Sequence, residues 1–259
     1  MINYNTVWVA TVPRTGSMWA TNIVREIFSV TDHNVFPEQQ LKNDKDWQAA
    51  YQEGALKDPN PNNRYVLKVH TPLNQNLPKS KIITTIRNPY DTCASFFHFM
   101  KCDLDRAINV ALSLPTALAH YKKVKPENLF VLRYEHIEES PEKLISDLSI
   151  FLNTTISEEQ ALAISKKFTK EQVKQIISDT DQALQEKISN KQEIKAAEVV
   201  ILDEENYRSF DANTGFQTGH VSDRESGEWR LAFTEAEQER LVDALDASTI
   251  ELGYVSEKT

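Results

Sequence analysis

Cysteine is scarce in this chain: Cys93 and Cys102 are the only two among 259 residues. Two cysteines exclude a disulfide framework, and their spacing fits no zinc site. Long apolar runs are also missing, because no segment approaches the roughly eighteen consecutive apolar residues of a membrane-spanning helix. The first residues lack the basic and apolar regions of a secretion signal. These absences predict a cytoplasmic protein without a membrane segment.

None of the six glycines is followed by lysine. A Walker A loop needs a Lys and then a Ser or Thr directly after its last glycine, so this phosphate-binding motif is excluded. The exclusion disfavours an Mg-dependent kinase or NTPase. A nucleoside or nucleotide kinase-like phosphotransferase is kept only as an alternative interpretation.

Positive charge is in deficit, since 29 lysines and arginines face 38 aspartates and glutamates, a formal net charge of −9. This balance argues against nucleic acid, or a sulfated or carboxylated polysaccharide, as the partner. A small anion held in a locally basic pocket is compatible with it. With 40% hydrophobic residues the chain can bury a full core, and we expect a single domain over residues 1–259.

Runs typical of strands alternate with helical patterns along the chain. This alternation predicts an α/β fold with a central parallel sheet flanked by helices on both faces. In such sheets, ligands bind beyond the carboxyl ends of the strands. Arg14, His70 and Arg87 each follow a strand, so we expect all three to line one crevice. The strand-like runs are residues 6–12, 64–70, 81–86 and 128–133.

Three longer stretches lie between or after these units. Residues 30–63 are polar and indicate a long excursion that leaves the sheet, and residues 203–227 indicate a loop. We expect both to contact the acceptor or the cofactor. Residues 154–200 are charged and helical, with Ser157 as a helix cap. Thr234 begins the last helix with the pattern of a capping box.

Segment 11–19 joins a strand-like run directly to a helical one. Backbone N–H groups at a helix N-terminus point at a bound anion, and the helix dipole favours negative charge there. Gly16 allows the backbone to approach such an anion closely. Arg14, Thr15 and Ser17 add a cation and two hydroxyl groups. The segment predicts a cradle for phosphate or sulfate, although this composition also occurs in ordinary turns.

A second constellation follows the strand that ends near Ile86. Arg87 stands at the tip of that strand, and Ser95 lies about two turns into a helix that Asn88 caps and Pro89 begins. An arginine and a hydroxyl in this arrangement can hold a second phosphate. A solvent-facing pair is the plainer alternative.

Lys68 and His70 close another strand and project to the same side of it, because strand side chains alternate. A histidine at the carboxyl end of a strand can act as a general base, since its ordinary pKa lies near neutrality. His70 is therefore the candidate base beside the anion crevice.

Together these segments resemble the sulfotransferases that use 3′-phosphoadenosine 5′-phosphosulfate (PAPS), especially the cytosolic type. Pro13 to Trp19 is similar to the family's 5′-phosphosulfate loop, Pro-Lys-Ser-Gly-Thr-Thr-Trp, with Arg14 at the lysine position. Lys68-Val69-His70 matches Lys-Thr-His, whose histidine is the family's catalytic base, and Arg87 to Ser95 keeps the spacing of its 3′-phosphate motif. Val131 to Glu135 resembles the strand whose Tyr reaches the nucleotide, and Ser226 to Arg230 resembles the C-terminal Gly-Asp-Trp-Lys element. Motifs in family order seldom arise together by chance.

The sequence departs from the family at three points. The basic Arg-Lys-Gly triplet falls at Ser222, Asp223 and Arg224, of which only Arg224 is a cation. Arg14 replaces the loop lysine and can bind two oxygens, but with a different geometry. The family's dimer motif, Lys-Thr-Val-Glu, has no match near the C-terminus, so oligomeric state is left open. The weakened triplet keeps a non-catalytic nucleotide-binding protein as a second alternative.

The resemblance implies a P-loop-NTPase-like sulfotransferase fold and transfer of a sulfuryl group from PAPS, with PAP as product nucleotide and no metal. It implies catalysis by His70, Arg14 and Lys68. The acceptor is expected to be a small alcohol, phenol or amine, such as a natural product, neutral or cationic. Its pocket is expected to draw on residues 30–63, the helix segment Phe97–Met100 and residues 207–216, which carry aromatic side chains such as Trp47 and acidic ones such as Asp44. The residues implied to bind the cofactor are Arg14, Thr15, Gly16, Ser17, Met18, Trp19, Arg87, Ser95, Tyr134 and Arg224.

Overall fold

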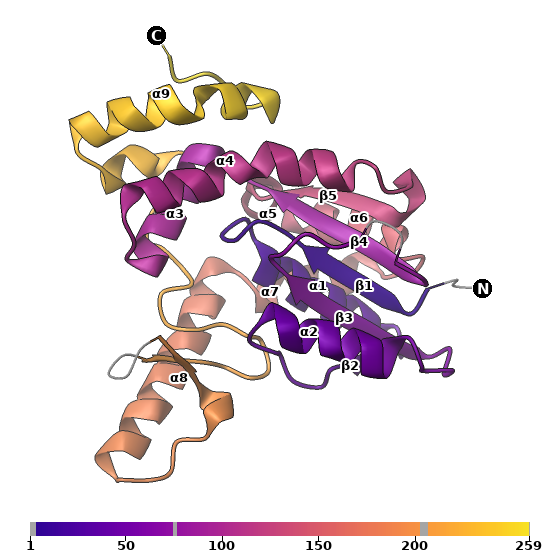
Figure 1. Ribbon diagram of the computed structural model, residues 1–259. Coiled ribbons are helices and arrows are strands. Elements are labelled where there is room, and N and C mark those ends of the chain that lie inside the picture. Colours follow the sequence, from indigo (N-terminus) through magenta and orange to yellow (C-terminus); the bar gives the residue numbers. More distant parts are fainter. Residues whose placement is uncertain (1–3, 75–76, 203–206, 259) are drawn as a thin grey trace.

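Five strands form one parallel sheet in the computed structural model of the protein, which describes residues 4–74, 77–202 and 207–258 (Figure 1). Their order across the sheet is β2-β3-β1-β4-β5, and each neighbouring pair is parallel. This arrangement confirms the predicted α/β fold class. The strands are β1 (Thr6–Ala10), β2 (Asn34–Phe36), β3 (Asn63–Val69), β4 (Ser80–Ile86) and β5 (Leu129–Arg133).

Helices connect the strands and dominate the second half of the chain (Figure 1). A separate pair of short strands, β6 (Val199–Ile201) and β7 (Tyr207–Ser209), is antiparallel. Short helical turns are a π-helix at Tyr51–Ala55 and 3-10 turns at Pro126–Asn128, Ala196–Glu198 and Glu228–Ala232. The α-helices are α1 (Ser17–Val30), α2 (Asp44–Ala50), α3 (Pro89–Met100), α4 (Leu104–Tyr121), α5 (Glu135–Glu139), α6 (Pro141–Phe151), α7 (Glu158–Lys167), α8 (Lys170–Ser189) and α9 (Glu235–Glu251).

The two faces of the sheet are buried under different helices, because successive residues of a strand point to opposite faces. Val7 and Val9 of β1 pack with α1, α6 and α7 in one apolar cluster. Trp8 between them packs with Trp47 of α2 and Tyr121 of α4 in another. Helices therefore cover both faces, with α2 in the foreground of Figure 1.

The helix starts that the sequence predicts are confirmed. Pro89 is at the first position of α3, and the Asn88 side chain accepts a hydrogen bond from the backbone N–H of Tyr90. Ser157 and Thr234 cap α7 and α9 in full capping boxes. These caps satisfy N–H groups that a helix cannot satisfy internally.

Residues 30–63 are not wholly an excursion from the sheet, because a short strand interrupts them before the chain leaves the sheet and returns at β3. β2 lies within them and pairs in parallel with β3, in the register Asn34↔Asn63 to Phe36↔Tyr65. It forms the edge of the sheet through backbone hydrogen bonds. The sequence did not predict it, because three residues are too few to show the alternation of apolar and polar residues that marks a strand. Trp47 of α2 then returns to the core, fully buried.

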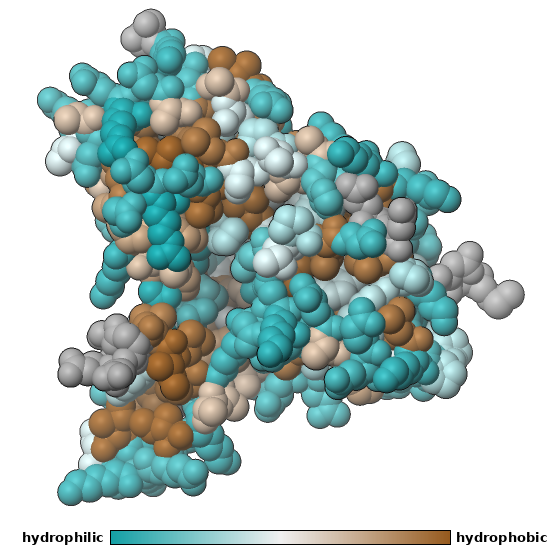
Figure 2. All heavy atoms as spheres, in the orientation of Figure 1, coloured by the Kyte–Doolittle hydropathy of each residue, from teal (hydrophilic) through white to brown (hydrophobic). Residues whose placement is uncertain are grey.

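Residues 203–227 are not wholly a loop either. β7 lies within this range, while residues 203–206 fall outside the described residues. α8, β6 and β7 form a part that stands off from the sheet, at the lower left of Figure 1. Beside it the surface is hollowed, and an apolar patch at β6 includes Ile201 and Leu202, which are exposed (Figure 2). Among the described residues, no helix combines the length and apolar character needed to cross a membrane.

Candidate active site

Three strand ends meet at one edge of the sheet. β1 lies between β3 and β4, so the residues that follow these strands are neighbours. Nη1 of Arg87 is 3.5 Å from the carbonyl oxygen of Arg14, and Nδ1 of His70 is 3.0 Å from the carbonyl oxygen of Thr11. The structure therefore brings Arg14, His70 and Arg87 to one place, as the strand-end rule predicts.

The loop before α1 is shaped by close contacts. Gly16 has φ 96, in the left-handed region, and α1 begins at the next residue without a side-chain cap. A Cβ at Gly16 would lie 2.9 Å from Ile137 Cδ1 and 3.1 Å from Tyr134 Cδ2, so glycine alone fits well. Thr15 Oγ1 donates to the Val12 carbonyl at 2.7 Å. The uncapped N–H groups of α1 are left for an anion.

Ser17, Met18 and Trp19 form the first turn of α1. Ser17 is buried, and Met18 packs against Gly215, where a Cβ would meet the Met18 Cε. Trp19 is only 8% exposed and belongs to the apolar cluster on the α1 face of the sheet. Its stacking on an adenine ring stays a prediction.

Arg14 is held by a hydroxyl, a carbonyl and an aromatic ring. Its Nε donates to Ser95 Oγ at 3.0 Å, its Nη2 donates to the His220 carbonyl at 2.8 Å, and its Cζ lies 4.2 Å from the centroid of the Phe99 ring. Burial, followed by the charge of Arg87, lowers the pKa of Arg14, yet a guanidinium keeps its proton at neutral pH. Among the described residues, no carboxylate forms an ion pair with it.

Arg87 is buried and its guanidinium lies over the Tyr134 ring, with Cζ 3.9 Å from the ring centroid. Its Nε is buried and has no hydrogen-bond partner within the described part of the chain. In the first turn of α3, the Asp91 carboxylate accepts the Gly227 N–H at 2.8 Å and so fixes the segment around Gly227 against the helix. A phosphate oxygen is one acceptor that can satisfy this buried guanidinium N–H.

Lys68 and His70 meet at the end of β3. His70 Nδ1 must carry its proton, because it lies 3.0 Å from the Thr11 carbonyl oxygen, which can only accept. His70 Nε2 therefore bears the lone pair, and it lies 3.4 Å from Lys68 Nζ. Burial, followed by the charge of Lys68, lowers the pKa of His70 well below its usual range, so the ring is neutral at neutral pH.

Lys68 is itself nearly closed off from solvent. Burial lowers its pKa to about 8, and the Asp44 carboxylate opposes this shift. Asp44 also holds the end of β3, because it accepts the His70 N–H at 2.9 Å and the Thr71 N–H at 2.7 Å. The lysine is charged at neutral pH and faces a neutral imidazole.

Arg224 differs from the other predicted cofactor residues. Its guanidinium makes no hydrogen bond or ion pair with the residues that the structure describes, and its charge acts on His98 and Asp223. A contact between Arg224 and a 3′-phosphate stays a prediction.

Sequence reasoning did not single out two residues of this site, His220 and Arg208. The His220 ring stacks on Phe99, with centroids 5.1 Å apart, and Arg208 Cζ lies 4.0 Å from the centroid of the same ring. Burial, followed by the charges of Arg14 and Lys68, lowers the pKa of His220 well below its usual range. These contacts join segments over a hundred residues apart in the chain, and no local motif marks them.

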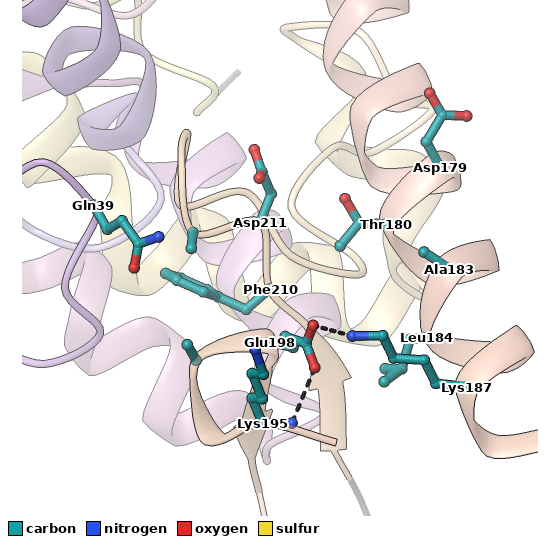
Figure 3. Close-up of a pocket in the computed structure, with 12 residues that line it drawn as sticks. Gln39, Asp179, Thr180, Ala183, Leu184, Lys187, Lys195, Glu198, Phe210 and Asp211 are labelled. Carbon is teal, nitrogen blue, oxygen red and sulfur yellow. Dashed lines mark hydrogen bonds and ion pairs between the residues drawn. The ribbon is translucent and has the colours of Figure 1, made fainter. Parts of the chain in front are cut away.

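A separate cavity of about 510 Å³ lies within the part formed by α8, β6 and β7 (Figure 3). Phe210 and Gln39 face it from one side and Leu184 of α8 from the other. Two of its charged groups, Lys187 and Glu198, form an ion pair beside it. None of its lining residues belongs to the cluster around Arg14 and His70.

Comparison with solved structures shows the same fold. Retinol dehydratase crystallised with androsterone and the inactive cofactor PAP has a TM-score of 0.59 and 16% identity, covering 98% of this chain and 82% of that one. Its complex with retinol and PAP has a TM-score of 0.60 and 17% identity, covering 100% and 84%. The mouse sulfotransferase SULT7A1 with PAP has a TM-score of 0.57 and 15% identity, covering 96% and 87%.

Sequence comparison gives the family directly. No curated protein matches this chain significantly. The family model of the sulfotransferase domain, however, matches residues 5–251, nearly the full length. The chain belongs to the sulfotransferase family.

Proposed function

We propose that this protein is a PAPS-dependent sulfotransferase that moves a sulfuryl group to a hydroxyl or amine of a small molecule. The observation that carries the proposal is a cluster of three cations, of which Lys68 and Arg87 are buried and Arg14 is half-buried; none is ion-paired in the described part of the chain. An anionic ligand would offset the cost of desolvating these charges. Solved structures of the same fold that were crystallised with PAP support PAPS as this ligand.

The residues fit a nucleotide with anionic groups at both ends. The Gly16 loop and the N-terminus of α1 would hold the 5′ end, where Arg14 and the N–H groups of residues 15–18 supply donors. Arg87 and Ser95 would hold the 3′-phosphate, which satisfies the orphaned Arg87 Nε. Tyr134 packs against the Arg87 guanidinium and fixes its position.

His70 is the proposed general base. When bound, PAPS supplies an activated sulfuryl group with a stable phosphate leaving group. His70 Nε2 then takes the proton of the acceptor hydroxyl or amine, since Nδ1 is already committed to the Thr11 carbonyl. The 3.4 Å contact between Lys68 and Nε2 is long, so an acceptor can replace the lysine there. Lys68 and Arg14 stabilise negative charge on the transferred group.

The anionic cofactor also tunes the base. The low pKa of His70 comes partly from the positive charge of Lys68 and, to a lesser extent, of Arg14. Negative charge beside these cations favours the imidazolium and so opposes part of the lowering of the His70 pKa, whose largest cause is burial.

Two measurements test the proposal. Calorimetry with PAP reports binding, and incubation with PAPS and a panel of alcohols, phenols and amines reports mass gain of the acceptor. We expect His70→Ala to bind PAP with unchanged affinity and to lose at least about a hundredfold in rate, as general-base variants do. A near wild-type rate in His70→Ala would show that the assigned base is wrong.

The alternatives give other results in the same assays. A non-catalytic nucleotide-binding protein would bind PAP without any mass gain, and a kinase would depend on ATP and Mg²⁺. We further propose one sulfotransferase domain over the chain and a cytoplasmic location, which the free thiols of Cys93 and Cys102 fit. We also propose that the acceptor is a natural product.

A further inference from the structure

A half-buried carboxylate bridges two segments just beyond the end of β5. Glu135 follows Tyr134 directly and begins α5. Its Oε1 accepts the backbone N–H of Asn88 at 3.0 Å, and its Oε2 accepts the hydroxyl of Tyr254 at 2.9 Å. The carboxylate therefore joins the residue that follows Arg87 to a segment far along the chain.

Tyr134 and Glu135 together hold the turn that carries Arg87. The N–H of Tyr134 donates to the Ile86 carbonyl at 2.9 Å, and the Tyr134 ring lies against the Arg87 guanidinium. The Asn88 N–H that Glu135 accepts belongs to the peptide group attached to the Cα of Arg87. Because a peptide group is planar, this hydrogen bond fixes the plane in which the Arg87 Cα lies. Arg87 is thus held at its main chain by Glu135 and at its side chain by Tyr134.

Tyr254, the second partner of Glu135, is itself fixed. Its ring lies against the Arg133 guanidinium, with Cζ 4.5 Å from the ring centroid, and its N–H donates to the Thr249 carbonyl at 3.0 Å. Arg133 also donates to the Leu252 carbonyl. Burial, followed by the charge of Glu135, raises the pKa of Tyr254 above its usual range, so the hydroxyl keeps the proton that it donates.

We infer that Glu135 is a positioning residue for recognition of the 3′-phosphate: it holds Arg87 in place and is itself held by Tyr254. This inference rests on the proposed function, in which Arg87 binds that phosphate. Glu135 acts by accepting hydrogen bonds and not by attracting the ligand, because a carboxylate repels a phosphate. Its removal is therefore expected to affect the 3′-phosphate contact and to spare the 5′ end of the nucleotide.

Calorimetry with PAP and with adenosine 5′-phosphate (AMP) tests the inference, because the two nucleotides differ only in the 3′-phosphate. The ratio of the Kd of AMP to the Kd of PAP measures how strongly that phosphate is recognised. We expect Glu135→Ala to lower this ratio at least about tenfold, while the Kd of AMP stays within about twofold of the wild type. A lower melting temperature with an unchanged ratio would make Glu135 a purely structural residue and overturn the inference.

Glu135→Gln separates geometry from charge. The amide keeps an oxygen for the Asn88 N–H, and its NH2 group can donate to the Tyr254 hydroxyl, which can also accept. We therefore expect Glu135→Gln to keep the ratio near its wild-type value. Equal ratios in Glu135→Gln and Glu135→Ala would assign the effect to charge and contradict the inference.

Tyr254→Phe tests the outer part of the arrangement. Asn88 keeps its partner in this variant, so we expect a smaller fall in the ratio, about two- to fivefold, as for the loss of one hydrogen bond. In the Glu135→Ala background the same substitution is expected to change the ratio no further, because Tyr254 acts through Glu135. An equal fall in both backgrounds would show that Tyr254 does not act through this carboxylate.

Tyr65→Phe is a matched control. The Tyr65 hydroxyl donates to the Asp58 carboxylate, also at 2.9 Å, near the start of β3 and so at the opposite edge of the sheet from the site. We expect this variant to keep the wild-type ratio. A fall as large as that of Tyr254→Phe would mean that the ratio responds to any loosening of the fold, and would overturn the inference.

Turnover gives a second readout. With PAPS varied at a fixed acceptor concentration, we expect Glu135→Ala to raise KM at least about tenfold and to leave kcat nearly unchanged, as for a contact made equally in the ground and transition states. A fall in kcat with an unchanged KM would refute the inference. A wild type that prefers PAP to AMP, with the same preference in Glu135→Ala, refutes the inference alone, whereas a wild type that binds no PAP refutes the proposed function as well.

Discussion

The titration of Lys68 is expected to appear in the pH dependence of kcat/KM. Its pKa is lowered to about 8 by burial, from an ordinary value above 10. The cation is present below this pKa and is lost as the pH rises through it, so we expect kcat/KM to fall above about pH 8. Lys68→Arg keeps its charge at high pH and is expected to lack this alkaline limb. The measurement is kcat/KM for PAPS, which reports the free enzyme, from about pH 6 to about pH 10 with an aliphatic hydroxy acceptor at fixed concentration. An unchanged limb in Lys68→Arg would assign it to another group.

Gly16 and Gly227 form a matched pair for testing the phosphate-binding loop. Both have positive φ, 96 and 89, but a Cβ at Gly16 meets Ile137 and Tyr134, whereas a Cβ at Gly227 meets nothing within 4 Å. We expect Gly227→Ala to lose about 1–2 kcal/mol of unfolding free energy from backbone strain alone. Gly16→Ala is expected to lose more and also to weaken PAP binding. Urea unfolding and calorimetry measure both; equal losses without a change in PAP affinity would contradict the proposed role of the loop.

At the scale of elements, the site depends on how α2 is joined to β3. Asp44 begins α2, and its carboxylate accepts backbone N–H groups of His70 and Thr71 at the end of β3. It also opposes the lowering of the Lys68 pKa. Asp44 is therefore a positioning residue with an electrostatic effect on the site.

We expect Asp44→Ala to lose about 2–3 kcal/mol of unfolding free energy, since hydrogen bonds to a charged group are worth about 1.5–3 kcal/mol. Asp44→Asn keeps an acceptor oxygen but no charge, so its loss is expected to be smaller. In both variants the alkaline limb of kcat/KM should move to lower pH, because the pKa of Lys68 falls without the carboxylate. A purely structural Asp44 would lower stability and leave the limb in place.

The elements also show what the sequence can and cannot predict. Arg14, His70 and Arg87 come shortly after apolar runs. The rule that ligands bind beyond the carboxyl ends of parallel strands was therefore enough to predict that they lie together. β2 escaped prediction because an edge strand of three residues has no period to detect. Trp47 looked like a binding residue in a polar segment, yet it fills the core. Arg208 reaches Phe99 only through tertiary packing, which no local pattern encodes.

At the scale of the whole molecule, the distribution of charge matters more than its sum. The chain has a formal net charge of −9, yet the cations Arg14, Lys68 and Arg87 lie together at one edge of the sheet. The excess of acidic residues repels long polyanions, while the local cluster attracts a small one. We therefore expect this protein to bind a small nucleotide in preference to nucleic acid.

Binding of PAP to this cluster should stabilise the whole fold. A ligand at one hundred times its Kd adds about 2.7 kcal/mol to the unfolding free energy, which corresponds to a rise in Tm of about 5–10 °C for a chain of this size. We expect AMP, which lacks the 3′-phosphate, to give a smaller rise at equal concentration. Arg87→Gln should remove the difference between PAP and AMP, because Arg87 is the proposed partner of that phosphate. Differential scanning fluorimetry measures these shifts, and equal stabilisation of the wild type by PAP and AMP would mean that the buried Arg87 has a purely structural role.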